Sequence, residues 1–468
     1  MNTTSDFRSF NYAYLWLICL VAAMGGLLFG YDWVVIGGAK PFYEPFLHIG
    51  PATPWKQGFA QSSALVGCLL GALMSGALAD KTGRRPLLLA AGLLFTVSAV
   101  WTALSTDYVT FNIARIIGGV GIGLASNMSP MYIAEISPAK IRGVFVSINQ
   151  LTIVIGILAA QLVNLWIAQP VTEETAEAIR ASWNGMYGWR WMFGAETIPA
   201  AAFFLLMFFV PESPRWLVKA GRDDKARNIL GRIGGDTYAA STLEEIRTTL
   251  SQEEIGRVRW SDLLEPKIAG ILVFGSFLAV AQQWCGINVI FNYAQEVFTN
   301  AGFSIDGTLL SIVLTGVTNL VFTIPALFLV DRLGRRPLML IGFGGLACVY
   351  VLMGLGYYQG WTGIPMLALV MIAIGSYATT LAPVTWVVLS EIFPNRIRGA
   401  AMSIAVFFLW IGCTTLTLTF PSLLRSLDAH GTFWLYATFC TMIFFILWRK
   451  LPETKGKSLE QIEHELVD

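Results

Sequence analysis

Charged residues are scarce in this chain, at 13% of its 468 residues, and it contains only three histidines. Soluble globular proteins carry roughly 25% charged residues. Hydrophobic residues make up 55% of the chain, which is more apolar sequence than a soluble core can bury but which a lipid bilayer can accommodate. The net charge of +1 gives no support for nucleic-acid binding. The composition therefore indicates a membrane protein.

Sequence motifs for enzymatic chemistry and for metal binding are also lacking. The chain has no Gly-x-Ser-x-Gly, no His-Glu-x-x-His and no Walker loop. Its six cysteines lie in apolar stretches without Cys-x-x-Cys spacing, which we interpret as packing residues rather than as disulfides or a zinc site. The sequence thus predicts neither catalytic residues nor a cofactor or metal.

Long apolar runs dominate what remains. A membrane-spanning helix needs about 20 mainly apolar residues, and the first run is too long for a cleavable signal peptide. Candidate spans lie near residues 14–36, 57–79, 86–105, 109–132, 144–168, 190–210, 268–298, 308–330, 337–357, 364–390, 399–424 and 431–449. We therefore predict an all-α membrane protein with twelve transmembrane helices in two groups of six.

One polar interval separates the two groups of spans. It has helix-like spacing with charged residues facing water, but too few apolar residues for a core of its own. We expect short cytoplasmic helices there. The predicted organisation is an N-terminal bundle, a helical linker, a C-terminal bundle and a cytoplasmic tail, at 1–210, 211–267, 268–454 and 455–468.

The distribution of Lys and Arg predicts the orientation of the chain. With the N-terminus inside, 25 of the 31 basic residues fall in inside segments, and Arg115 lies within the fourth span. The five outside residues are Lys40, Lys56, Arg180, Arg190 and Arg425. Because inside segments of membrane proteins are enriched in positive charge, both termini are predicted to be cytoplasmic.

Two motif pairs show that the halves are related. Asp80-Lys-Thr-Gly-Arg-Arg-Pro86 recurs as Asp331-Arg-Leu-Gly-Arg-Arg-Pro337, and Glu135-Ile-Ser-Pro-Ala-Lys-Ile-Arg-Gly143 recurs as Glu391-Ile-Phe-Pro-Asn-Arg-Ile-Arg-Gly399. Pro211-Glu-Ser is echoed more weakly by Pro452-Glu-Thr. Two pairs at nearly one offset indicate two homologous halves, which favours a substrate site at their interface near mid-membrane.

Together with Pro211-Glu-Ser-Pro-Arg-Trp216, Gln282-Gln-x-x-Gly-x-Asn288 and Gly30-Tyr-Asp32, these motifs resemble the sugar porter family of the major facilitator superfamily, nearest to bacterial xylose–proton symporters. The resemblance implies a monomeric transporter in the lipid of a bacterial inner membrane. It would import a monosaccharide, a pentose such as xylose or a hexose, together with a proton by alternating access. A passive sugar uniporter and a sugar sensor of the same fold stay open as alternatives.

Polar residues at membrane depth are the candidates for sugar binding. Amide side chains donate and accept hydrogen bonds as sugar hydroxyls require, and an indole offers a flat face and one N–H. We expect Gln282, Gln283 and Asn288 to act from one helical run. The resemblance implies the same role for the amides Gln150 and Asn319 and for the aromatics Trp386, Tyr293, Trp410 and Phe29.

The sequence departs from the family pattern at two positions near this predicted site. Asn292 stands before Tyr293 where the family has a tyrosine pair, and Leu409 replaces the glutamine found beside Trp410 in the xylose symporters. A leucine cannot hydrogen-bond a sugar hydroxyl, so the identity of the sugar stays open.

Charged residues inside the spans are candidates for proton coupling. A buried carboxyl group is disfavoured unless it is protonated or paired, so a pair that forms and breaks can bind and release a proton. The resemblance implies that Asp32 is the coupling site, with Arg115 as its partner and Glu196 as an adjunct.

The repeated loops are candidates for an inside gate. Arginine and carboxylate side chains can pair through two hydrogen bonds, and we expect such pairs to latch the inside when the protein faces outward. The predicted gating residues are Arg84, Arg85, Glu135, Arg142, Glu212, Arg215, Arg335, Arg336, Glu391, Arg398 and Glu453.

Overall fold

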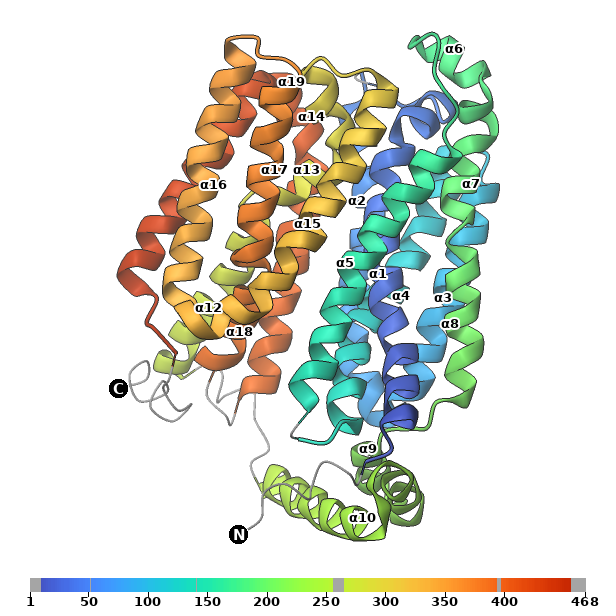
Figure 1. The fold of residues 1–468 in the computed structure, drawn as a ribbon, viewed down its shortest axis with the longest axis vertical. Coiled ribbons are helices and arrows are strands. Elements are labelled where there is room, and N and C mark those ends of the chain that lie inside the picture. The colour runs from blue at the N-terminus through green and yellow to red at the C-terminus, as the bar shows by residue number, and fades with distance from the viewer. Residues whose placement is uncertain (1–9, 51, 140, 256–264, 394–396, 456–468) are drawn as a thin grey trace.

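The computed structural model describes residues 10–455 except 51, 140, 256–264 and 394–396, and within these ranges it contains helices but no strands (Figure 1). Part of the predicted linker and nearly all of the predicted tail, 456–468, lie outside the described residues. The described helices form two bundles that stand side by side (Figure 1).

The N-terminal bundle contains six membrane-spanning segments. Five are single helices: α1 (Tyr12–Phe46), α2 (Pro54–Thr82), α3 (Arg84–Leu104), α4 (Tyr108–Ile136) and α5 (Arg142–Ile167). The sixth span, Asn184–Phe209, follows the short helix α6 (Ala176–Ala181) and comprises a π-helical turn, α7 (Trp189–Gly194), α8 (Thr197–Leu206) and a final 3-10 turn.

The C-terminal bundle is built from helices that are more often interrupted. The seventh span comprises α12 (Pro266–Trp284), α13 (Ile287–Asn292) and α14 (Ala294–Asn300). The remaining elements are α15 (Ile305–Leu333), α16 (Arg335–Tyr358), the pair α17 (Ile364–Thr379) and α18 (Leu381–Ile392), and α19 (Arg398–Lys450).

The last element, α19, crosses the membrane twice. At 1.5 Å per residue its 53 residues would extend about 80 Å, far more than the hydrocarbon core of a bilayer. Its backbone leaves the helical region at Asp428, with φ 56° and ψ 179°. The chain turns there, so the described residues contain twelve spans, and the predicted fold of two six-helix bundles is confirmed.

Two further helices lie at one end of the N-terminal bundle (Figure 1). We call this end of the molecule the linker side and the opposite end the far side. The two helices are α9 (Pro214–Lys219) and α10 (Asp223–Ile255), and the backbone of α10 breaks at Gly235. The backbone N–H of Asn11 donates to the carbonyl of Ile233 at 2.7 Å, and the ring of Phe10 packs on that of Tyr238. These contacts fix α10 to the start of α1.

Glycines allow neighbouring helices within the N-terminal bundle to approach closely. A Cβ added to Gly67 of α2 would lie 2.1 Å from the carbonyl oxygen of Ile116, and one added to Gly119 of α4 would lie 1.9 Å from that of Ala64. Small residues are the usual means of close helix packing in lipid, where no hydrophobic effect drives helices together.

The first span is longer than the sequence predicts. The apolar run ends near residue 36, yet α1 continues to Phe46 and includes Lys40, Pro41 and Pro45. Lys40 is completely buried, so it lies within the helix rather than in a loop that follows the span. The charge of Lys40 ends the apolar pattern in the sequence. In the structure an acidic partner, described below, allows the Lys40 side chain to lie inside the protein.

We predict that the linker side and the far side face opposite compartments. In a Cys348→Ser background, which removes the single exposed cysteine, Lys56→Cys near the far side and Lys225→Cys on α10 should react with a membrane-impermeant maleimide from opposite faces of sealed vesicles. Labelling of both from the same face would contradict twelve spans.

Candidate functional site

A buried ion pair joins two spans of the N-terminal bundle. Arg115 on α4 donates through Nη1 to Oδ1 of Asp32 on α1, and through Nη2 to the Asp32 carbonyl oxygen at 3.1 Å. Both residues are 2% exposed. The guanidinium lies 5.2 Å from the centre of the Phe193 ring. This geometry confirms that the only basic residue predicted within a span meets the lone acid of the first.

A second buried acid stands beside this pair. Glu196, between α7 and α8, lies next to both Asp32 and Arg115. Glu196 Oε1, Asp32 Oδ2 and Arg115 Nε have no hydrogen-bond partner among the described residues. One guanidinium can neutralise only one of two carboxylates, and a second buried carboxylate is strongly disfavoured. The three side chains therefore form a site that favours holding one proton.

A chain of amide hydrogen bonds runs through the C-terminal bundle. Asn288 donates to Oε1 of Gln283, Gln283 donates to Oε1 of Gln282 at 2.7 Å, and Gln282 donates to the Tyr377 hydroxyl. All three amide residues are buried. The sequence predicts the three amides, whereas Tyr377 is a residue that sequence reasoning missed.

The amides do not share one helix, contrary to the prediction. Gly286 adopts φ 85°, which ends α12 and starts α13, so Asn288 lies across the break from Gln282 and Gln283. A Cβ at Gly286 would also lie 2.9 Å from the Tyr436 ring. The glycine thus permits a turn that brings the amide of Asn288 back to that of Gln283.

The tenth span breaks where it meets this chain. Thr380, with φ −119° and ψ −81°, separates α17 from α18. Pro383 lacks the N–H that would bond the carbonyl of Thr379, which explains a break here. Tyr377 lies in α17 just before the break. Trp386, which is 39% exposed, lies in α18 just after it.

Aromatic rings from both bundles meet around Trp410 of α19. Its ring centre lies 6.1 Å from that of Phe29 and 6.0 Å from that of Trp33, both on α1. Trp410 is buried and its Nε1–H has no partner among the described residues. Phe29 and Trp410 are thus brought together as expected for two walls of one site, and Trp33 is an addition that the sequence did not single out.

The other predicted sugar contacts are not joined to the amide chain. Asn319 is buried on α15 and Gln150 is half-buried on α5, and neither side chain has a hydrogen bond to the amide chain within the described residues. The Tyr293 hydroxyl donates to the Thr417 carbonyl at 2.7 Å, and its ring packs on Phe420. Tyr293 is therefore engaged in packing at the far side.

An ion pair between the bundles, which sequence reasoning missed, lies at the far side. Lys40 of α1 binds Glu296 of α14 and lies 3.6 Å from Glu44, one turn further along α1. Gln57 of α2 donates to Glu44 at 3.0 Å. The spacing of Lys40 and Glu44 on one helical face was the available signal, but the expected end of the span at residue 36 hid it.

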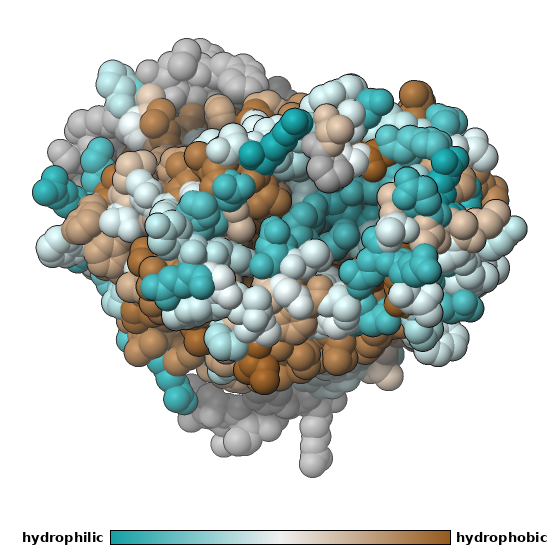
Figure 2. Space-filling model, turned by 90° about the horizontal axis from the view of Figure 1, so that it is seen from above, coloured by the Kyte–Doolittle hydropathy of each residue, from teal (hydrophilic) through white to brown (hydrophobic). Residues whose placement is uncertain are grey.

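Contacts between the bundles gather toward the far side. Besides the Lys40 pair, Gln161 Nε2 donates to Thr315 Oγ1 at 3.3 Å, and the Ile305 N–H donates to Glu174 at 2.9 Å. Figure 2 shows this face, where hydrophilic residues surround a central hollow. Because Lys40 is fully buried, the contact closes the protein beneath that surface.

Matching charged clusters occupy the linker side of each bundle. Arg84 donates to Glu135 through Nε at 3.2 Å and Nη2 at 2.8 Å. Arg335 donates to Glu391 through the same two nitrogens at 3.2 and 2.9 Å. Ser213 in the first cluster and Thr454 in the second hydrogen-bond the same carboxylates. The weak Pro-Glu-Ser and Pro-Glu-Thr echo therefore reflects a duplicated structure.

The two loops share a shape that follows from their glycines and acids. Gly83 and Gly334 have φ values of 98° and 92°, and a Cβ on either would lie within 2.6 Å of an oxygen of Glu212 or Glu453. These carboxylates accept the backbone N–H of Arg84 and Arg335 at the starts of α3 and α16, each at 3.0 Å. Negative charge at a helix N-terminus is stabilising.

The two capping acids have different electrostatic surroundings. Burial raises the pKa of Glu212 above its ordinary value. Burial also raises the pKa of Glu453, but hydrogen bonds from the backbone N–H groups of Lys455, Arg335 and Arg336 outweigh it, so this pKa lies below its ordinary value. The cap of the C-terminal bundle therefore stays charged to lower pH than its counterpart.

These clusters brace each bundle internally. In each arginine–glutamate pair both residues belong to the same bundle, so these pairs are not contacts between bundles. Arg85 and Arg336 donate to the carbonyls of Phe208 and Trp448, each at 2.6 Å. Of the remaining predicted gating residues, Arg142 is exposed, Arg215 is half-buried and the Arg398 side chain lies outside the described residues.

The chain is similar to known proteins both in sequence and in structure. The sequence profile of the family described as sugar (and other) transporter matches residues 18–466. The D-xylose-proton symporter of Escherichia coli (strain K12) is 40% identical, covering 97% of this chain and 96% of that protein. The arabinose-proton symporter of Bacillus subtilis (strain 168) is 39% identical with the same coverage. A solved structure, the inward open conformation of the xylose transporter XylE from E. coli, superposes with a TM-score of 0.84 at 38% identity, covering 97% of this chain and all of that one.

We predict that the Lys40 contact stabilises the closed far side. Lys40→Met leaves Glu44 and Glu296 without their cation, which should disfavour this conformation by about 1–3 kcal/mol, less than for a fully buried pair because Glu296 is 22% exposed. Spin labels on the exposed residues Thr106 and Asn300, one on each bundle at the far side, should report a population at longer distance.

Lys56→Met is the matched control, because it removes the same charge at the far side from a lysine that lies over the rings of Trp55 and Tyr108 in its own bundle. An unchanged distance distribution in Lys40→Met, or an equal change in the control, would show that the pair does not hold the far side closed.

Proposed function

Because the chain belongs to the sugar transporter family, we propose that it is a secondary active transporter that imports a monosaccharide together with a proton by alternating access. The observation that carries the proton coupling is the buried group of two carboxyls and one guanidinium formed by Asp32, Glu196 and Arg115. Two relatives that are named pentose–proton symporters support the same function. Their names favour a pentose as the sugar.

The proton binds at Asp32. When the Asp32 carboxylate is charged, Arg115 holds α1 against α4. Protonation removes the charge that Arg115 neutralises, so the pair weakens and the guanidinium turns to the nearby Glu196. The arginine thus keeps one charged partner in either state, which avoids an isolated buried charge. Changes in this pairing let α1 move relative to the rest of its bundle.

The sugar binds between the amide chain and the aromatic cluster. Gln282, Gln283 and Asn288 already exchange hydrogen bonds with one another, and the free N–H of Trp410 adds a donor. Sugar hydroxyls replace these internal hydrogen bonds at little cost, since amides both donate and accept. Phe29 provides a flat apolar face from the other bundle.

Coupling between the two ligands passes through α1. Asp32 faces α4, while Phe29 and Trp33 contact Trp410 in the C-terminal bundle. A movement of α1 on protonation therefore changes the wall of the sugar site directly. Alternating access follows when the far-side contact opens and the bundles close instead at the linker side, where the charged clusters keep each bundle rigid as it moves.

The linker side faces the cytoplasm. The excess of basic residues lies on that side, which is the usual bias of a membrane protein. With both termini inside, the protein resides in the plasma membrane, the inner membrane in a bacterium. One chain contains both bundles and hence the whole site, so we expect it to act as a monomer surrounded by membrane lipid.

Truncating the central amide should weaken sugar binding. We predict that Gln283→Ala lowers affinity for a bound pentose by about 1–3 kcal/mol, because it leaves Asn288 and the sugar with unpaired polar groups. Calorimetry with xylose and arabinose measures the change, and Gln169→Ala on an exposed loop is the control. Unchanged binding in Gln283→Ala would place the sugar elsewhere.

The coupling proposal predicts a separation of two activities. Asp32→Asn imitates the protonated acid permanently, so uphill sugar accumulation driven by a pH gradient should be lost, whereas sugar binding should survive because it uses other residues. Proteoliposomes with an imposed pH gradient measure accumulation, and calorimetry measures binding. Asp224→Asn on the exposed surface of α10 is the control.

Two outcomes would overturn proton coupling at this acid. If the unaltered protein shows neither uphill accumulation nor sugar-induced proton movement, it is a passive uniporter and Asp32 is structural. If Asp32→Asn retains both, the proton binds at another residue, and Glu196→Gln becomes the variant to measure.

A further inference from the structure

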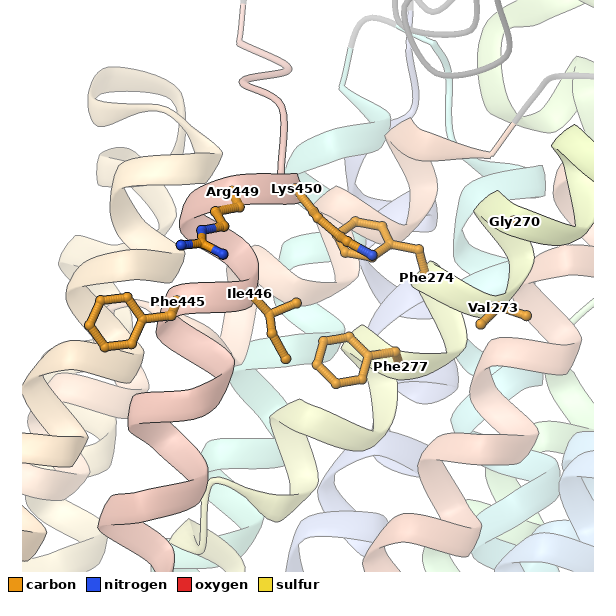
Figure 3. A pocket seen from close by; sticks show the side chains of 8 residues that line it. All are labelled: Gly270, Val273, Phe274, Phe277, Phe445, Ile446, Arg449 and Lys450. Atoms are coloured by element: carbon orange, nitrogen blue, oxygen red, sulfur yellow. The ribbon is translucent and has the colours of Figure 1, made fainter.

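A groove separate from the inter-bundle site lies on the linker side of the C-terminal bundle (Figure 3). It has a volume of about 480 Å³ and lies between the first turns of α12 and the last turns of α19. Its lining consists of Gly270, Val273, Phe274, Phe277, Phe445, Ile446, Arg449 and Lys450.

Most of the groove is apolar and open to the outside of the bundle. Val273 is 69% exposed, Phe445 is 50% exposed, and Phe274 and Phe277 are partly buried. Both α12 and the end of α19 belong to apolar segments long enough to span a membrane. The exposed side chains of this groove therefore face lipid, and an acyl chain is the occupant that such a surface favours.

Positive charge is confined to one end of the groove. Arg449 and Lys450 are the last two residues of α19 and both are exposed. Figure 3 shows their side chains at one end, with the rings of Phe277 and Phe445 further along the helices. Neither side chain has a hydrogen bond or an ion pair with the described residues, and none of the lining residues is acidic. The cations are therefore available to an anion.

We propose that this groove binds an anionic phospholipid of the cytoplasmic leaflet. The phosphate lies between Arg449 and Lys450, and the upper part of one acyl chain lies along Phe277 and Ile446. The order of charge and apolar surface matches that of a lipid at the membrane boundary, where basic residues at the cytoplasmic ends of helices attract anionic headgroups. A zwitterionic lipid is disfavoured because the lining offers no carboxylate to its ammonium group. The leaflet follows from the orientation proposed above.

The purified full chain in detergent, measured by native mass spectrometry, tests this proposal. Dioleoyl phosphatidylglycerol should remain bound at lower lipid concentration than dioleoyl phosphatidylethanolamine, which has the same chains. The double substitution Arg449→Gln and Lys450→Gln should weaken retention of phosphatidylglycerol about thirtyfold, since each basic residue near an anionic headgroup contributes on the order of one kcal/mol.

The matched control, Arg222→Gln with Lys225→Gln, removes two exposed charges near the start of α10 and should leave retention unchanged. Val273→Trp fills the groove but keeps both charges, and it should also weaken retention. Thermal unfolding of each variant checks that it is folded.

Three results would overturn the site. These are equal retention of the two lipids, an equal loss in the control double variant, and displacement of phosphatidylglycerol by an equal concentration of glycerol 3-phosphate, which would identify a site for soluble anions. Because the readout is lipid retention, its failure is distinct from failure of sugar transport.

Discussion

The structure of the N-terminal bundle depends on one guanidinium that faces two carboxyl groups away from water. Arg115 cannot stand alone at membrane depth, and neither Asp32 nor Glu196 can be charged there without it. Three spans must therefore remain close enough to share one cation, and α1 approaches α4 closely at Gly25, where an added Cβ would lie 2.3 Å from Ser129 Oγ of α4. The unequal number of acids and bases makes the protonation state of the site sensitive to small movements of its helices.

The helix that carries Asp32 also forms part of the seam with the other bundle. Phe29, Trp33, Gly37, Lys40 and Glu44 recur at helical spacing along α1. The first four approach the C-terminal bundle, and Glu44 lies beside Lys40. Asp32 lies on a different face, against α4. One helix thus connects the buried charged site to the aromatic cluster around Trp410 and to the far-side contact.

The sequence predicts features that extend over many residues better than it predicts the points where a helix is interrupted. Apolar runs and the motif repeat predict twelve spans and two related halves, and span-embedded charges predict the Asp32–Arg115 pair. The repeat also explains why Glu212 and Glu453 cap equivalent helices. Hydrophobicity, however, does not change where a helix breaks inside the membrane. The interruption at Gly286 and the neighbour Tyr377 were therefore not predicted, because they depend on one backbone dihedral and on tertiary contact. The end of the first span was predicted too early for the opposite reason, since the charge of Lys40 ends the apolar run although the helix continues past it.

Two kinds of ion pair in this molecule have different physical requirements. Pairs within a bundle, such as Arg84–Glu135 and Arg335–Glu391, have forked geometry and additional hydroxyl and capping partners, which suits contacts that persist while bundles move as units. A pair between bundles must break in every cycle, so it cannot be worth more than a few kcal/mol without trapping one state. Lys40–Glu296 meets this requirement because Glu296 is partly exposed and regains water as the contact opens. The free energy needed to separate the bundles at the far side is therefore small. The stronger ion pairs lie within each bundle, where no surfaces separate.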